Sequence, residues 1–69
     1  MFIDFRKNIQ HININGESVY IWLYRKTNVL AFGINGTSFH EVIADYKNKT
    51  KCEILNIIMG KTWEYLKVE

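Results

Sequence analysis

The sequence has no proline, one cysteine and only two arginines among its 69 residues. A lone Cys52 excludes an internal disulfide, and a small chain without disulfides is typical of a reducing compartment. The chain also lacks a run of about 18 apolar residues and the basic-then-apolar start of a signal peptide. We therefore expect a cytoplasmic protein without membrane contact, in the host-cell cytoplasm if a phage encodes it.

Strong charge of one sign is also missing. The formal net charge is +2, and the nine basic residues are dispersed along the chain. A dedicated duplex-binding surface usually concentrates many cations on one side, so the sequence does not favour one. At 69 residues the chain predicts one small domain, residues 1–69, near the lower limit for folding on a single core.

The stretch 17–26 predicts a central strand, because it is rich in β-branched and aromatic residues and has no glycine. Successive side chains of a strand point to opposite faces. One face is therefore aliphatic and the other aromatic: Val19, Ile21 and Leu23 lie on the first, and Tyr20, Trp22 and Tyr24 on the second.

A hairpin is predicted just before this strand, where Asn15-Gly16 separates two alternating runs. Both turn positions need a positive φ, which Asn and Gly tolerate. The resulting register places Ile12 opposite Val19 and His11 opposite Tyr20. His11 and Asn13 then join the aromatic face, which marks it as the face nearer water.

Two further strands complete an antiparallel four-stranded β-meander. After a turn at Thr27-Asn28, a strand over 29–34 places Leu30, Phe32 and Ile34 on the aliphatic face. A first strand from Met1, with its turn at Lys7-Asn8, places Ile3 opposite Ile12 and Asp4 opposite His11.

The C-terminal half predicts one or two helices packed on one sheet face, which gives an α+β fold. A capping box at Ser38 and Glu41 precedes a helical stripe over 39–48, and a second box at Thr50 and Glu53 opens a helix over 52–59. Beyond Gly60 two alternatives remain. A fifth, edge strand over 62–68 is favoured, and a continued helix is the other reading.

No catalytic, metal or cofactor site is predicted. His11, His40 and Cys52 are the soft or imidazole ligands, and no two of them have the spacing of a metal site. Cys52 with His40 is the best nucleophilic pair, but no third orienting group is in view. A buried structural cysteine is the simpler interpretation.

The aromatic stripe is the candidate binding site, with two interpretations. It could form a second core beneath Trp63 and Tyr65, or it could be a recognition surface. As a surface it would use Tyr20, Trp22, Tyr24, His11, Asn13 and Lys26.

We expect its partner to be another protein or a second copy of the chain. This expectation describes a compact non-enzymatic regulator or inhibitor, of the kind that phages and mobile elements encode. The alternative is single-stranded RNA or DNA bound by base stacking, for which Arg6 and Lys26 supply a thin cationic track.

Overall fold

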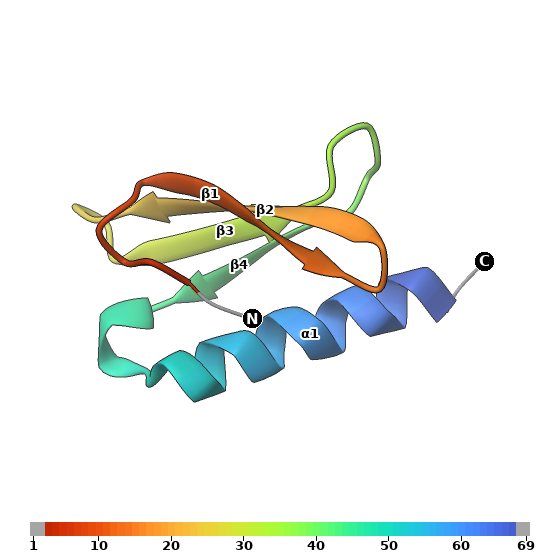
Figure 1. Cartoon of the computed structure of the whole chain (residues 1–69). Helices are drawn as coiled ribbons and strands as arrows, with labels where there is room; N and C mark the ends of the chain where they lie inside the picture. Colours follow the sequence, from red (N-terminus) through yellow and green to blue (C-terminus); the bar gives the residue numbers. More distant parts are fainter. Residues whose placement is uncertain (1–2, 68–69) are drawn as a thin grey trace.

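A computed structural model describes residues 3–67 and shows an antiparallel four-stranded sheet with one long helix against it (Figure 1). The strands follow one another in the sheet in chain order. The elements are β1 (Ile9–Ile14), β2 (Glu17–Tyr24), β3 (Val29–Gly33), β4 (His40–Ala44), a 3₁₀ turn (Tyr46–Asn48) and α1 (Lys51–Lys67). The predicted α+β class is confirmed, with one α-helix in the described chain.

The β1–β2 hairpin has the predicted register. Ile12 pairs with Val19 and His11 pairs with Tyr20. Asn15 and Gly16 have φ angles of 51° and 87°, so both turn positions are left-handed as the Asn-Gly pair predicts. The Asn13 side chain accepts a hydrogen bond from the Gly16 N–H at 3.1 Å and stabilises the turn.

The β2–β3 connection keeps the predicted faces but moves the pairing by two residues. The loop covers residues 25–28, so Tyr20 pairs with Gly33 and Trp22 with Ala31. Because the longer loop still has an even length, every side chain stays on its expected face.

The helix predicted over residues 39–48 is wrong, because His40–Ala44 form strand β4 along β3. Ile43 pairs with Leu30 and is 5% exposed, so β4 extends the aliphatic face of the sheet. Pairing satisfies the backbone groups along one edge of β3, which a helix at this position would leave open. The strand ends at Ala44. The next residue, Asp45, has a φ of 58°, and its N–H donates to the Asn28 carbonyl at 2.8 Å.

The predicted first strand is also wrong, since residues 3–8 contain no strand. The side chain of Gln10 takes the place of a neighbouring strand. Its Oε1 accepts from the Asp4 N–H at 2.9 Å, and its Nε2 donates to the Asp4 carbonyl at 2.8 Å. Asp4 pairs with Arg6 instead of facing His11, whereas Ile3 is buried in the core. Met1 lies outside the described residues.

In α1 the predicted capping box is confirmed and the predicted fifth strand is wrong. The Thr50 N–H donates to Glu53 Oε1 at 2.8 Å, and the Glu53 N–H donates to Thr50 Oγ1 at 3.1 Å. The helix continues past Gly60 to Lys67, and Val68 lies outside the described residues. Gly60 is on the exposed side, so its missing side chain leaves no gap in the core.

The core lies between α1 and the aliphatic face of the sheet (Figure 1). Ile54, Ile58 and Thr62 are fully buried one turn apart along the helix, and Thr62 Oγ1 donates to the Ile58 carbonyl at 2.7 Å. The ring of Tyr65 stacks on Phe39 at 4.8 Å. No helix among residues 3–67 has the length and apolar character to cross a bilayer. Among residues 3–67 no helix covers the opposite face of the sheet.

Candidate docking surface

The face of the sheet opposite α1 is the candidate docking surface, and we call it the open face. Every second residue of each strand contributes a side chain to it. The register assigns to it Ile9, His11, Asn13, Ser18, Tyr20, Trp22, Tyr24, Val29, Ala31, Gly33, His40, Val42 and Ala44. None of these residues is Lys, Arg, Asp or Glu. The open face is therefore uncharged when its two histidines are neutral.

A row of rings crosses the open face from β1 to β4. The ring centroids of His11 and Tyr20 are 5.4 Å apart, those of Tyr20 and Trp22 are 6.2 Å apart, and those of Trp22 and His40 are 6.0 Å apart. The row can cross β3 because Ala31 and Gly33 have little or no side chain there. The sequence thus places large aromatic side chains on β2 and very small side chains opposite them on β3.

Large apolar side chains lie exposed around this row. Ile9 is 64% exposed, Val42 is 59% exposed and Tyr24 is 53% exposed. Single exposed apolar residues are common on soluble proteins, but these three share one uncharged surface with the ring row. An exposed apolar patch is a candidate interaction site.

The predicted site residues divide between the open face and its surroundings. Tyr20, Trp22 and Tyr24 lie on it with His11 and Asn13, as expected from their parity. Lys26 lies in the loop beyond the end of β2, outside the open face. The structure therefore brings the predicted aromatic residues together and places Lys26 at the border of the open face, where it lines a pocket with Trp22 and Tyr24.

The sequence prediction misses four residues of the open face. It gives Ile9 no face, and it includes His40, Val42 and Ala44 in the helix over 39–48. The stretch His-Glu-Val-Ile-Ala does alternate at the strand period, with His40 and Val42 on one side and Glu41 and Ile43 on the other. This alternation is the signal in the sequence that indicates strand β4.

The C-terminal segment does not form a second core over the rings. Residues 51–67 pack on the aliphatic face, where Tyr65 contacts Phe39. Trp63 is 43% exposed. The interpretation in which Trp63 and Tyr65 cover the aromatic stripe is therefore wrong for the described chain.

The predicted nucleophilic pair does not meet. His40 lies on the open face, and Cys52 is exposed on α1, which packs on the other side of the sheet. The expected buried position of Cys52 is also wrong. Within residues 3–67 no three His, Cys, Asp or Glu side chains gather in a metal-binding arrangement.

No family model, curated protein or solved structure matches this chain. We therefore infer its function from the geometry and charge of its own surfaces.

Proposed function

We propose that the protein is a non-enzymatic regulator or inhibitor that docks its open face on another protein. The observation that carries the proposal is an uncharged, ring-centred sheet face that the protein's own helix leaves uncovered. Tyrosine and tryptophan dominate the energetic centres of protein interfaces, whereas charged residues are depleted there. The small polar residues Asn13 and Ser18 lie toward the rim of this face.

The size of the open face favours a different protein over a second copy. Four strands about 4.8 Å apart, with about five residues each at 3.3 Å, give a flat area of roughly 300–400 Å². A stable interface usually buries about 800 Å² on each partner. The accessible surface of protruding side chains exceeds this flat area, so two sheets meeting face to face would still form only a small interface. We therefore infer a partner that also reaches around an edge of the sheet.

The uncharged face also argues for protein over single-stranded nucleic acid at this place. Base stacking on aromatic rings is accompanied by cations that follow the phosphate backbone. The open face contains no Lys or Arg. The cations that border it, Arg25 and Lys26, lie only at its Tyr24 end, where they line a pocket with Trp22 and Tyr24, and not along the row of rings. A protein partner therefore fits the open face better than RNA or DNA does.

A matched pair of variants tests the proposal. Val42→Lys places a charge on an exposed position of the open face, and Asn56→Lys places the same charge on the exposed side of α1. We expect a protein captured from a host lysate, with nuclease present, to be retained by the wild type and Asn56→Lys and lost by Val42→Lys. Calorimetry with the purified partner should then repeat this order of affinities.

Two results would contradict the proposal. One is capture that no longer occurs once nuclease is added, because the bound species would then be nucleic acid. The other is a wild-type dimer at micromolar concentration, seen by light scattering and lost in Val42→Lys. That result would make a second copy the occupant of the open face.

A further inference from the structure

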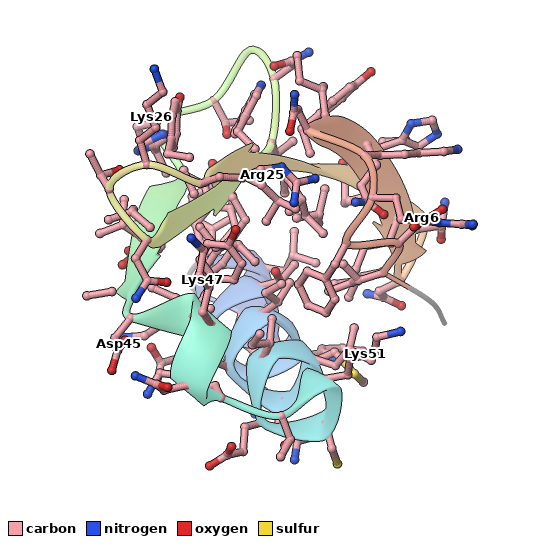
Figure 2. The ribbon with its side chains drawn as sticks, turned by 90° about the vertical axis from the view of Figure 1, so that its left-hand side faces the viewer. Arg6, Arg25, Lys26, Asp45, Lys47 and Lys51 are labelled. Carbon is pink, nitrogen blue, oxygen red and sulfur yellow. The ribbon has the colours of Figure 1, made fainter. Side chains whose placement is uncertain are left out.

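The fold gathers most of the basic residues at one end of the molecule, although they are dispersed in the sequence. In an antiparallel meander, the start of β1, the β2–β3 loop and the connection from β4 to α1 all lie at the same end of the sheet (Figure 1). Figure 2 looks onto this end. We call it the basic end, and its cations are Arg6, Lys7, Arg25, Lys26, Lys47, Lys49 and Lys51.

The charge of the molecule is therefore strongly asymmetric. Seven of the nine cations lie at the basic end, together with the three acids Asp4, Asp45 and Glu53, which leaves a formal charge of +4 there. The rest of the sequence has two cations, Lys61 and Lys67, and four acids, for a formal charge of −2. The net charge of +2 conceals this separation.

The acids of the basic end are already held by neighbours within the protein. Asp4 accepts two hydrogen bonds from the Arg6 guanidinium, at 2.9 and 3.0 Å. These bonds from Arg6 hold the pKa of Asp4 at about 2, below its usual 3.8. Asp45 accepts from the side-chain amides of Asn28 and Asn48, while Glu53 caps α1. These hydrogen bonds join none of the three carboxylates to Arg25 or Lys47.

Two cations at the centre of the basic end are held in place by uncharged oxygen atoms. Arg25 donates from Nε to the Asn8 side chain at 2.8 Å and from its terminal nitrogen to the Phe5 carbonyl at 2.7 Å. Lys47 Nζ donates to the Arg25 carbonyl at 2.7 Å. These bonds order the two side chains without cancelling their charges, so less conformational entropy is lost when an anion binds.

A pocket of about 240 Å³ lies among these side chains, lined by Phe5, Arg25, Tyr46, Lys47 and Lys49. Its aromatic residues stack on each other, with the Phe5 and Tyr46 centroids 6.1 Å apart, and Tyr46 is 5% exposed. These rings serve the core and offer little surface for a stacked base or for insertion into a lipid layer. What the basic end presents is positive charge.

We propose that the basic end binds the phosphate backbone of a nucleic acid, by charge and without reading the bases. Lysine supplies most of its cations, and lysine is depleted in protein interfaces but common at phosphates. Contacts to phosphate position a protein on nucleic acid and carry no sequence information. This site adjoins the open face at Tyr24 but consists of different residues, and the proposed protein docking does not depend on it.

The test is a titration of the full chain against a fluorescent DNA duplex of about 20 base pairs, followed by anisotropy from about 50 to 200 mM salt. With three phosphates contacted, the logarithm of the binding constant should fall against log salt with a slope of about −3. A duplex of shuffled sequence should bind equally well.

Two double variants locate the site. Lys26→Gln with Lys49→Gln removes two exposed cations from the basic end, and should weaken binding about tenfold and reduce the salt slope by about 2. Lys61→Gln with Lys67→Gln removes the same charge from the other end, and should change affinity less than about twofold. Unfolding curves of both variants should match that of the wild type, which controls for loss of the fold.

Four results would overturn the inference. They are no binding at about 50 mM salt, an equal loss in both double variants, competition by polyglutamate as strong as by unlabelled DNA, and equal binding to vesicles that contain phosphatidylserine. Trp22→Ala adds a further control. If it abolishes binding while the Lys26 and Lys49 variant does not, the nucleic acid lies on the open face, and the docking proposal fails separately.

Discussion

The ring centroids of Trp22 on β2 and His40 on β4 lie 6.0 Å apart, although β3 runs between their strands. The contact is made above Ala31 and Gly33, the smallest side chains of the open face. Side chains from non-adjacent strands thus form one continuous surface. Substitutions on this surface and in the rest of the fold should distinguish residues that bind a partner from residues that stabilise the protein.

Gly33→Ala should destabilise the protein. A Cβ at this position would collide with the Phe39 carbonyl oxygen and lie 3.3 Å from the His40 Cα, and both of these are backbone atoms. Overpacking of this kind costs about 1–3 kcal/mol. Urea unfolding followed by circular dichroism should show a lower midpoint, and an unchanged midpoint would mean that β4 is free to shift away.

Gly60→Ala is the matched control and should stabilise the protein. Nothing lies within 4 Å of a Cβ added there, and the residue is inside α1. Replacing an exposed glycine in a helix by alanine gains about 0.5–1 kcal/mol. The melting temperature should rise by about 4–8 °C for each kcal/mol. A fall would contradict the continuous helix through this residue.

Ile21→Ala should mainly reduce stability and Trp22→Ala should mainly reduce partner binding, although the two residues are neighbours on β2. Ile21 is fully buried against α1, so its truncation should cost about 2–5 kcal/mol of folding free energy. Trp22 lies on the open face, so its truncation should cost less stability and abolish partner binding. Equal losses of stability in the two variants would show that Trp22 belongs to a core.

Thr50→Ala should destabilise α1 through loss of its cap. The Thr50 hydroxyl accepts the Glu53 N–H at 3.1 Å, and the substitution leaves that donor without this partner. Loss of such a cap costs about 1 kcal/mol. Thr50→Ser, which keeps the hydroxyl, should retain most of the stability in the same thermal melt.

The free energy of unfolding should fall at acidic pH because Asp4 becomes protonated. Hydrogen bonds from Arg6 lower the pKa of Asp4 from its usual 3.8 to about 2 in the folded state. The unfolded chain therefore takes up this proton first, and protonation favours unfolding. The contribution of Asp4 is complete above about pH 4 and is lost between about pH 4 and pH 2.

Asp4→Asn and Arg6→Gln both test this pH dependence. Asp4→Asn removes the titrating group, and Arg6→Gln removes the cause of its lowered pKa. Urea midpoints measured from about pH 2 to pH 6 should fall less steeply in each variant than in the wild type. A wild-type slope in both variants would assign the acid sensitivity to other carboxylates.

Local chemistry made the β1–β2 hairpin and the start of α1 predictable from the sequence. Asn15-Gly16 fits two positive φ angles, and Thr50 with Glu53 forms a reciprocal cap, so neither depends on distant residues. The assignment of Tyr20 and Trp22 to one face was also predictable, because parity survives any even loop length.

Elements decided by tertiary context were not predictable in the same way. Phe39, Val42, Ile43 and Tyr46 have helical spacing, yet pairing with β3 makes the middle of this stretch a strand. Residues 3–8 have the propensity of a strand, but the side chain of Gln10 forms hydrogen bonds with the backbone of Asp4 in place of strand pairing. The concentration of cations at the basic end follows from topology, so the order of charges along the chain did not reveal it.

β2 ends at Tyr24 on the open face, and the next residue, Arg25, lies at the basic end. A protein and a nucleic acid bound at these two places would be in contact with each other. Thermodynamic linkage then requires each ligand to alter the affinity of the other by the same factor. A partner with an acidic border beside Tyr24 would weaken binding of the nucleic acid, and a partner with a basic border would strengthen it. The charge of the partner would therefore decide whether the two ligands exclude or reinforce each other.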